Sequence, residues 1–395
     1  MQDFTQYTPT DIVFGRDAEK ETGRLAKKWG AERVLIIYGG GSVVKSGLLK
    51  SVEQQLDKEG IEHTSIGGVQ PNARLALAQK AGMSAIKFKA NMILAVGGGS
   101  VIDTAKAAAL SAVNQDSELW DIWTRQIPAP DCALPVGVVL TIAAAGSEMS
   151  DSAVLTNEET GKKKGFSLDI IRPIFAVMDP ALMFTLPKDQ IACGVVDILM
   201  HTLERYFTPV EGNMLTDEIA EGLMRTITTQ GLKAYQNPSD YEALSEVMWC
   251  SSLSHNGLTG LGRANDFTCH KLGHELSGMF DTPHGASLSA LWGSWARYVY
   301  QTDPERFANY GRKVWGIDIE DTDEAAQAAI KRTEQFFRDL DMPTCIGELR
   351  PGVQTDDLIK KLADSATDGD TVKLGTFQPL DMDDVIAVYR MANHR

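Results

Sequence analysis

Short runs of β-branched and apolar residues alternate with helical stretches and glycine clusters through the first 185 residues of the chain. Apolar residues at helical spacing predict helices over residues 73–89 and 100–113. Four runs predict buried strands: residues 33–38 (RVLIIY), 92–96 (MILAV), 136–142 (VGVVLTI) and 173–178 (PIFAVM). Alternation of this kind is typical of a doubly wound parallel sheet. Residues 1–185 therefore predict an α/β domain.

The second part of the sequence, residues 186–395, has a different pattern. Long amphipathic stretches replace the glycine-punctuated strands after the segment DPALMFTLP (179–187). Five stretches have helical spacing: residues 188–206, 214–235, 241–258, 266–279 and 324–340. This spacing predicts an all-helical second domain.

The composition argues against several classes of protein. The chain has 38 basic and 53 acidic residues, which disfavours a nucleic-acid partner because neutralising phosphate requires clustered Lys and Arg. No apolar run approaches the roughly 20 residues that cross a bilayer, and no secretory signal pattern opens the sequence. The five cysteines are scattered, so we expect neither a disulfide framework nor a thiolate zinc site. We expect a cytoplasmic protein with no membrane partner.

Glycine-rich turns follow two of the predicted strands. The first turn consists of Gly39, Gly40, Gly41 and Ser42, and the same GGGS pattern recurs at residues 97–100. Backbone N–H groups in such turns can hold phosphate oxygens, and glycine lets a phosphate approach the chain closely. Neither turn fits the G-x-G-x-x-G fingerprint, so an ordinary tight turn is the alternative for each. Two such turns together favour a nucleotide at the switch point of the sheet.

Two further polar residues lie close to predicted turns. Asp103 lies one helical turn after the second GGGS, where it either caps the helix or contacts a cofactor. Ser147 belongs to the segment AGSE after the third predicted strand. That segment is a third candidate phosphate turn, with an ordinary strand-to-helix turn as the alternative.

The predicted helical domain concentrates metal-ligating side chains. Asp197 and His201 are spaced i, i+4, and His270 and His274 repeat this spacing, so each pair lies on one face of a helix. His284 follows in the segment TPHG. A carboxylate with several imidazoles suits a first-row divalent ion such as Fe²⁺ or Zn²⁺. Separate structural roles are the alternative, and spacing does not distinguish which histidines are ligands.

The combined motifs resemble those of the iron-containing (group III) alcohol dehydrogenases. The resemblance runs from Phe14 to the C-terminal helices and includes GGGSVIDTAK (97–106), GVVDILMHTLE (194–204) and HKLGHELSGMFDTPHG (270–285). The segment YGGGSVVKSG (38–47) resembles the NADPH-dependent butanol dehydrogenase or aldehyde reductase branch. The resemblance implies a dehydroquinate synthase-like architecture, with a dinucleotide-binding α/β domain and an all-α metal-binding domain.

The resemblance also implies roles for individual residues. The family's metal ligands correspond to Asp197, His201, His270 and His284. His274 corresponds to an additional histidine near the nicotinamide. The contacts to the cofactor correspond to Asn72, Gly97, Gly98, Ser100, Asp103, Thr141, Ser147 and Lys163. The family's threonine-rich TTAGTGSE is here TIAAAGSE, so this stretch offers fewer polar side chains to the cofactor.

The first glycine turn bears on which cofactor is preferred. Aligned on Gly47, Gly40 takes the position where NAD-preferring relatives carry Asp. The missing carboxylate would not repel a 2′-phosphate, to which Ser42 and Lys45 could donate. We therefore expect NADP(H), while a merely flexible turn would leave NADH and NADPH nearly equivalent.

Together these features predict an NADP-dependent alcohol dehydrogenase that uses a divalent metal. It would transfer hydride between NADP(H) and a small primary alcohol or aldehyde, in a cleft between the two domains. We also expect a homodimer, with the edge strand TDIVFG (10–15) covered by a partner. The alternatives are a glycerol-type polyol dehydrogenase, a sugar-phosphate cyclase of the dehydroquinate synthase type and a non-catalytic metal scaffold.

Overall fold

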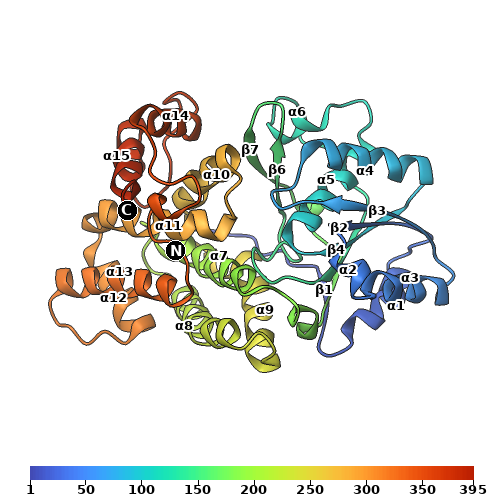
Figure 1. Cartoon of the computed structure of the whole chain (residues 1–395), viewed down its shortest axis with the longest axis horizontal. Helices are drawn as coiled ribbons and strands as arrows, with labels where there is room; N and C mark the ends of the chain where they lie inside the picture. The colour runs from blue at the N-terminus through green and yellow to red at the C-terminus, as the bar shows by residue number, and fades with distance from the viewer. The chain divides into compact units, whose positions relative to one another are not determined.

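The computed structural model describes residues 1–395 and contains two compact units (Figure 1). The sheet unit comprises Tyr7–Leu186 and Ser239–Ser252. The helical unit comprises Met1–Gln6, Pro187–Pro238 and Leu253–Arg395. The units therefore differ from a single cut after residue 185, because one segment of each half of the sequence packs with the other unit.

The sheet unit is built on six parallel strands in the order β1-β8-β5-β4-β2-β3. The strands are β1 (Asp11–Phe14), β2 (Arg33–Gly39), β3 (Glu62–Val69), β4 (Met92–Gly97), β5 (Val136–Leu140) and β8 (Phe175–Met178). The helices are α1 (Thr22–Lys28), α2 (Ser42–Lys45), α3 (Leu48–Lys58), α4 (Leu75–Phe88), α5 (Gly99–Val113) and α6 (Leu119–Trp123). The predicted parallel α/β architecture is confirmed. β3 was not predicted, because this edge strand is mostly exposed or half-buried and carries no continuous apolar run.

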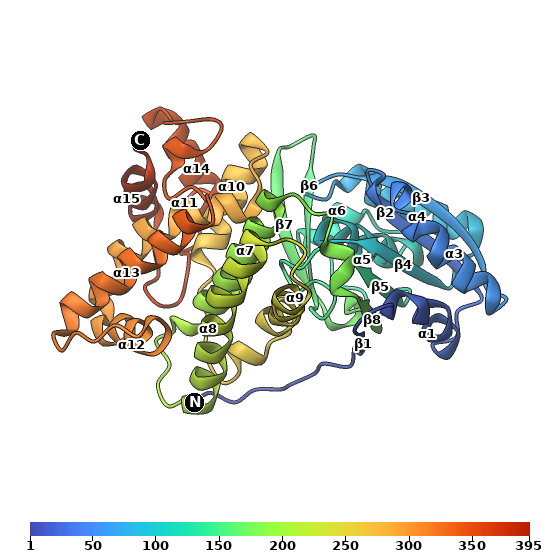
Figure 2. The same ribbon diagram turned by 60° about the horizontal axis from the view of Figure 1, so that its bottom comes forward.

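Burial on both faces explains the apolar strands of this sheet. Val34 and Ile36 of β2 belong to a cluster that includes Leu25 of α1 and Val52 of α3. On the other face of the sheet, α5 contacts β2 and β4, and α4 contacts β2. Figure 2 shows α3 and α4 beside the strands that they cover.

The two glycine turns lie at the same edge of the sheet. β2 and β4 are parallel neighbours, with Tyr38 paired with Val96, so the turns after Gly39 and Gly97 are adjacent. Since β3 lies on one side of β2 and β5 on the far side of β4, the strand order reverses between β2 and β4. Ligands of open α/β sheets bind at such a switch point, outside the carboxyl ends of the strands.

A separate antiparallel hairpin follows β5 in the sequence. It is formed by β6 (Ser152–Asn157) and β7 (Lys162–Ser167). Its inner residues Leu155 and Phe166 pack in a cluster with Leu110 of α5 and Trp123 of α6. The hairpin therefore packs against α5 and α6.

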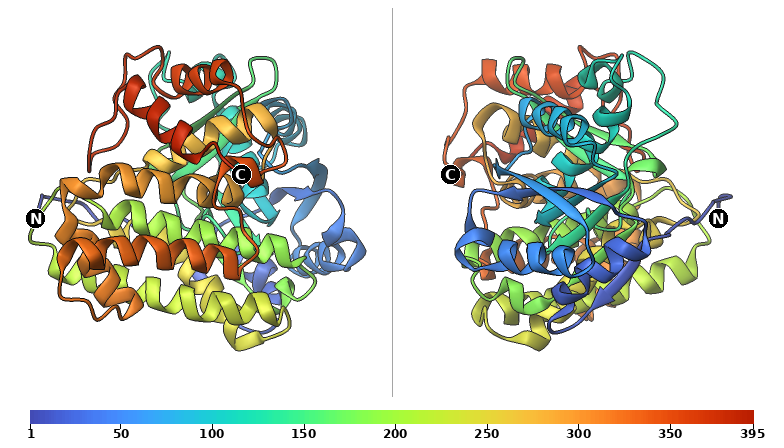
Figure 3. Two further views of the ribbon diagram at one scale, coloured as in Figure 1. Left: turned by 60° about the vertical axis from the view of Figure 1, so that its left-hand side comes forward. Right: turned by 90° about the vertical axis from the view of Figure 1, so that its right-hand side faces the viewer.

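The helical unit has no strands of its own, as the sequence predicted. Its helices are α7 (Lys188–Tyr206), α8 (Met214–Gln236), the end of α9 (Tyr241–His255), α10 (Thr268–Phe280), α11 (His284–Val299), α12 (Pro304–Trp315), α13 (Thr322–Asp339), α14 (Asp356–Ala366) and α15 (Met382–Ala392). Figure 3 shows the longest of these side by side, and α7 contacts both α8 and α11. No helix combines the length and the apolar character needed to cross a bilayer.

Candidate metal and cofactor sites

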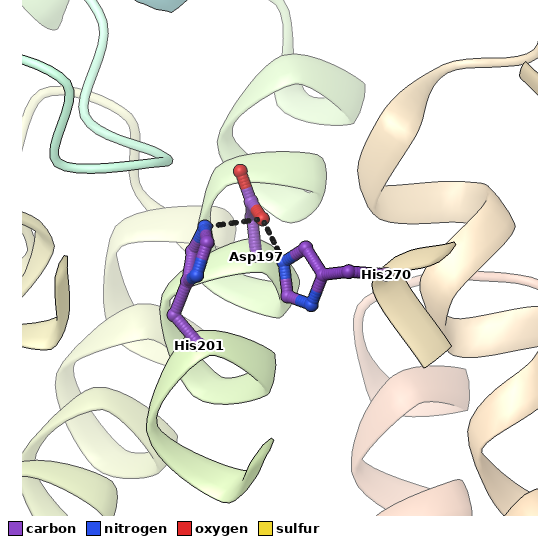
Figure 4. Close-up of side chains that lie close together, drawn as sticks. All are labelled: Asp197, His201 and His270. Carbon is purple, nitrogen blue, oxygen red and sulfur yellow. Dashed lines mark ion pairs between the residues drawn. The ribbon is translucent and has the colours of Figure 1, made fainter. Parts of the chain in front are cut away.

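The helix α7 presents two candidate metal ligands on one buried face. Asp197 and His201 are four residues apart, one helical turn, so their side chains lie one above the other. No glycine or proline interrupts the helix from Val195 to Tyr206, and each of these residues is buried. Figure 4 shows both side chains turned toward His270, which comes from α10.

Three imidazole nitrogens converge on one carboxylate oxygen. The Nε2 atoms of His201 and His270 lie 3.5 and 3.6 Å from Oδ1 of Asp197. The Nε2 atom of His284 lies 3.7 Å from the same oxygen. The ligand atoms of Asp197, His201 and His270 also lie within 4.8 Å of one another. The structure therefore brings together the four residues that the family resemblance implied as metal ligands.

The chemistry of these atoms fits a divalent metal ion. Oδ1 of Asp197 and Nε2 of His270 are buried and have no hydrogen-bond partner. Polar atoms in this state cost free energy unless they are paired or bind a cation. Four ligands placed tetrahedrally about 2.1 Å from one ion are about 3.4 Å apart, close to the spacing observed here. One carboxylate oxygen with imidazole nitrogens suits Fe²⁺ or Zn²⁺.

His284 is the most accessible member of this group. Its side chain is 24% exposed, whereas those of Asp197, His201 and His270 are each 6% exposed. His284 is the first residue of α11, directly after Pro283. The next residue, Gly285, lies so close to α7 that a Cβ there would be 2.4 Å from the carbonyl oxygen of Cys193. Glycine thus permits the close approach of α11 that brings His284 to Asp197.

A buried carboxylate orients His270 from behind. Glu204, which has no exposed side-chain surface, contacts Nδ1 of His270 and accepts a 3.2 Å hydrogen bond from its backbone N–H. A proton held on Nδ1 by the carboxylate leaves Nε2 free to coordinate a metal. Burial alone would lower the pKa of His270, but the nearby carboxylates of Glu204 and Asp197 raise it to about 9. Metal binding would compete with the proton that this raised pKa favours on Nε2.

Arg205 and His255 lie beside His201, the second candidate ligand on α7. Arg205 donates 2.7 Å hydrogen bonds to the carbonyl oxygen of His201 and to Nδ1 of His255. The rings of His201 and His255 are 4.1 Å apart between centroids. Burial, together with the neighbouring His255, His270 and Arg205, holds the pKa of His201 well below its usual range. His201 is therefore neutral, which is the form that binds metals.

His274 lies next to the four candidate ligands. It follows His270 by one turn of α10, and its ring centroid is 6.4 Å from that of His270 and 5.3 Å from that of His284. His201, His270 and His284 each place Nε2 within 3.7 Å of Oδ1 of Asp197. The structure thus places His274 beside His270 and His284, one helical turn after His270.

Sequence reasoning assigned no role to Glu204, Arg205 or His255. Glu204 lies three residues after His201 on the same helix, so its position on the ligand-bearing side of α7 was a usable signal. His255 had no such signal, because it lies at the end of α9, fifty residues away from Arg205. Its place beside His201 depends on tertiary packing alone.

The cofactor residues implied for the second glycine turn form one cluster in the sheet unit. Thr141 donates its backbone N–H to the carbonyl oxygen of Gly97, at 3.1 Å. A Cβ on Gly97 would lie 2.5 Å from Val101, and one on Gly98 would lie 2.9 Å from Ile142. Packing within the protein is thus a sufficient reason for glycine at these two positions. Close approach of a phosphate is therefore not needed to explain why residues 97 and 98 are glycine.

Gly40, in the first glycine turn, is different. A Cβ at Gly40 or Gly41 would meet nothing within 4 Å. Gly41 has a φ of 121°, which favours glycine, but Gly40 has no positive φ. Neither packing nor backbone conformation therefore requires glycine at position 40. Ser42 and Lys45 of the following short helix are exposed.

Asp103 ties the second turn to the hairpin instead of capping α5. Its Oδ2 accepts a 3.0 Å hydrogen bond from the backbone N–H of Val154, while its buried Oδ1 has no hydrogen-bond partner. Burial raises the pKa of Asp103 to about 6, against the opposing effects of Lys106 and of a hydrogen bond from Ser147. Lys106 is itself buried and donates to the carbonyl oxygens of Ser150 and Ser152. Asp103, a predicted site residue, thus joins α5 to the hairpin strand β6.

The remaining implied residues lie near the same edge. Nζ of Lys163, on β7, donates a 2.9 Å hydrogen bond to Oδ1 of Asn72. Asn72 has a left-handed backbone, with a φ of 58°. The backbone carbonyl of Ser100 accepts a hydrogen bond from the hydroxyl of Thr104 within α5. The structure therefore pairs Lys163 with Asn72, which are 91 residues apart.

Replacing Glu204 with Gln should weaken metal binding about 10- to 100-fold, because the amide holds the Nδ1 proton of His270 less strongly than a carboxylate. Metal content after dialysis against graded concentrations of a chelator measures this change. Glu221→Gln is the matched control, since Glu221 is also buried but accepts its hydrogen bond from Tyr206. Equal retention of metal by Glu204→Gln and the wild type would contradict the role of Glu204.

Comparison with known proteins identifies the family of the chain. Residues 9–180 match the family model described as iron-containing alcohol dehydrogenase, and residues 191–393 match the C-terminal model of the same family. The chain is 37% identical over 392 residues to NADH-dependent butanol dehydrogenase A of Clostridium acetobutylicum, with 99% of both chains covered. It is also 37% identical over 372 residues to the NADPH-dependent aldehyde reductase YqhD of Escherichia coli, with 92% of this chain and 93% of the relative covered.

Solved structures agree with this assignment. The crystal structure of NADH-dependent butanol dehydrogenase A from Thermotoga maritima matches with a TM-score of 0.95 and 34% identity, over 100% of this chain and 99% of that chain. A crystal structure of E. coli YqhD matches with a TM-score of 0.93 and 34% identity, over 99% of both chains. The family predicted from the motifs is confirmed: the chain belongs to the iron-containing alcohol dehydrogenases and is an oxidoreductase of that class.

Proposed function

We propose that this protein is a metal-dependent alcohol dehydrogenase that transfers hydride between NADP(H) and a small aldehyde or primary alcohol. The observation that carries the proposal is the convergence of three imidazole nitrogens on the unpaired Oδ1 of Asp197. We assign the metal to Asp197, His201, His270 and His284. Relatives named butanol dehydrogenase and aldehyde reductase support a substrate of the butanal type.

The residues of the chain would divide the work of the reaction. When bound, the nicotinamide would supply or accept the hydride and the divalent ion would polarise the substrate oxygen. Glu204 holds His270 in position, and burial, together with the neighbouring His255, His270 and Arg205, keeps His201 neutral. His284 is the most accessible ligand, so we propose that substrate oxygen approaches on its side. His274 would relay the proton of the alcohol through its imidazole.

The proposed preference for NADP(H) rests on the first glycine turn. The relatives do not decide it, since their names include both NADH-dependent and NADPH-dependent enzymes. Gly40 has no packing or backbone reason to be glycine, which supports a role for the open space beside it. Ser42 and Lys45 are exposed and would donate to a 2′-phosphate.

We also propose a homodimer that covers the edge strand β1. This strand pairs only with β8, so its other side offers unpaired backbone groups to a second chain. Phe14, at the end of β1, contacts Trp249 and both rings are about 40% exposed. A second copy of the chain would bury this aromatic pair.

The different roles proposed for His270 and His274 predict different effects when each is replaced with alanine. His270→Ala should lose both metal and activity, because a ligand is removed. His274→Ala should keep the metal but slow turnover about 10²-fold or more, because a proton relay is removed. Metal content by mass spectrometry and NADPH oxidation with butanal measure the two effects.

Metal retention by His270→Ala equal to that of the wild type would refute the metal assignment, and metal loss by His274→Ala would refute the division of the histidines. An enzyme that oxidised glycerol efficiently but did not reduce butanal would favour a polyol dehydrogenase instead.

Gly40→Asp should shift the preference from NADPH toward NADH. A carboxylate about 4 Å from a phosphate charge costs about 4 kcal/mol at an effective dielectric constant of about 20. We expect kcat/KM for NADPH to fall at least tenfold, with a smaller change for NADH. Gly40→Asn is the matched control, because it adds nearly the same volume without charge and should keep the NADPH preference. Loss of that preference in both variants would show that volume, not charge, is responsible.

The proposed dimer predicts a solution mass of twice 43.1 kDa. Light scattering at micromolar concentration measures this mass directly. Phe14→Asp, on β1, should shift the population toward monomer, because it places a charge in the exposed aromatic pair that a second chain would bury. A wild-type protein that was monomeric at this concentration would refute the proposal.

A further inference from the structure

The helix α9 holds the turn that follows β5. Ser251 and Ser252 lie on this helix, about one hundred residues after the turn, and both are completely buried. They belong to Ser239–Ser252, the one segment of the predicted helical half that packs with the sheet unit. Their hydroxyl groups contact the turn Ala144–Glu148.

Ser251 saturates its hydroxyl group with the backbone of this turn. Its Oγ accepts hydrogen bonds from the N–H groups of Ala144, at 3.1 Å, and Gly146, at 3.2 Å. The same hydroxyl donates to the carbonyl oxygen of Ala144, at 3.1 Å. A serine hydroxyl offers one donor and two acceptor sites, so these three bonds use all of them.

Ala145, between these two residues, is half-buried, and no hydrogen bond within the chain uses its N–H. The turn therefore has two amides bound to α9 and one amide left between them.

The neighbouring residue, Ser252, fastens the end of the same turn. Its hydroxyl donates a 2.5 Å hydrogen bond to Oε1 of Glu148. Glu148 is 1% exposed, and burial raises the pKa of its carboxyl group despite this hydrogen bond. Two adjacent serines thus hold both the backbone and the buried side chain of the turn.

The turn lies against the residues assigned to the cofactor. Thr141, just before it, is bonded to the carbonyl oxygen of Gly97. The side chain of Ile142 lies over Gly98, and Oγ of Ser147 would lie 3.5 Å from a Cβ on Gly99. A change in the backbone of residues 144–146 would therefore be transmitted to the second glycine turn.

We propose that Ser251 is a positioning residue of the cofactor site, which shapes the Ala144–Gly146 turn before the dinucleotide binds. This inference rests on the proposed function, in which residues 97–103, 141 and 147 bind the cofactor. The alanines of the turn have no polar side chains to fix its shape, so the hydroxyl from α9 performs that task. Preorganisation of this kind strengthens binding because less ordering is needed when the ligand arrives.

The test is direct binding of NADPH and NADH to the purified full-length protein, followed by nicotinamide fluorescence. Ser251→Ala should raise the Kd of the preferred cofactor about tenfold, a loss of about 1.4 kcal/mol. In steady-state assays KM for the cofactor should rise similarly, while kcat at saturation should change less than twofold. Ser251→Cys has nearly the same volume but a weak acceptor, so it should weaken binding as well, even if the alanine variant fails to fold.

Ser245→Ala is the matched control, because Ser245 lies on the same helix and its hydroxyl bonds only to the carbonyl oxygen of Tyr241, one turn earlier. This variant should bind both cofactors as the wild type does. Wild-type affinity in Ser251→Cys, or equal weakening in Ser245→Ala, would overturn the inference and leave the proposed function standing. A wild-type protein that bound neither cofactor would overturn both.

Discussion

The arrangement of α7, α10 and α11 depends on one carboxylate oxygen, Oδ1 of Asp197, around which their histidines gather. Three helices must bring imidazole nitrogens to within 3.7 Å of it, and the buried charge has no hydrogen-bond donor of its own. Such an arrangement is costly without a cation, since burial penalises an unpaired carboxylate. The packing of α7, α10 and α11 can therefore be understood as a scaffold that holds these groups together before a metal binds.

Two neighbouring residues, Glu204 and Arg205, affect the protonation of the candidate ligands His270 and His201. Glu204 holds a proton on Nδ1 of His270, while burial lowers the pKa of His201 and the charge of Arg205 adds to that effect. The two neighbours have opposite charge and act on different histidines. Because they are consecutive on α7, the same helix that supplies two ligands also supplies the groups that tune their partners.

In the sheet unit, neutral backbone and hydroxyl groups hold the turns of the candidate cofactor site. Its turns lie at the carboxyl ends of β2, β4 and β5, and one backbone hydrogen bond, from the N–H of Thr141 to the carbonyl oxygen of Gly97, joins the last two. Ser251 adds a hydroxyl from a helix that comes much later in the sequence. Packing accounts for Gly97 and Gly98, whereas Gly40 has open space around it. The glycines of two turns with the same sequence thus have different physical reasons.

Local patterns in the sequence determined the parallel sheet, the helical second half and the polar pairs spaced i, i+4 on α7 and α10, because periodicity and spacing are properties of neighbouring residues. The resemblance to the family, not the spacing, assigned His274 a role different from that of the other histidines. Only the tertiary structure decided that His255 lies beside His201, that Ser239–Ser252 packs with the sheet unit and that Ser251 holds the turn after β5. These contacts join residues fifty or more positions apart and use common residue types. They depend on how the helices pack, and no local pattern encodes that packing.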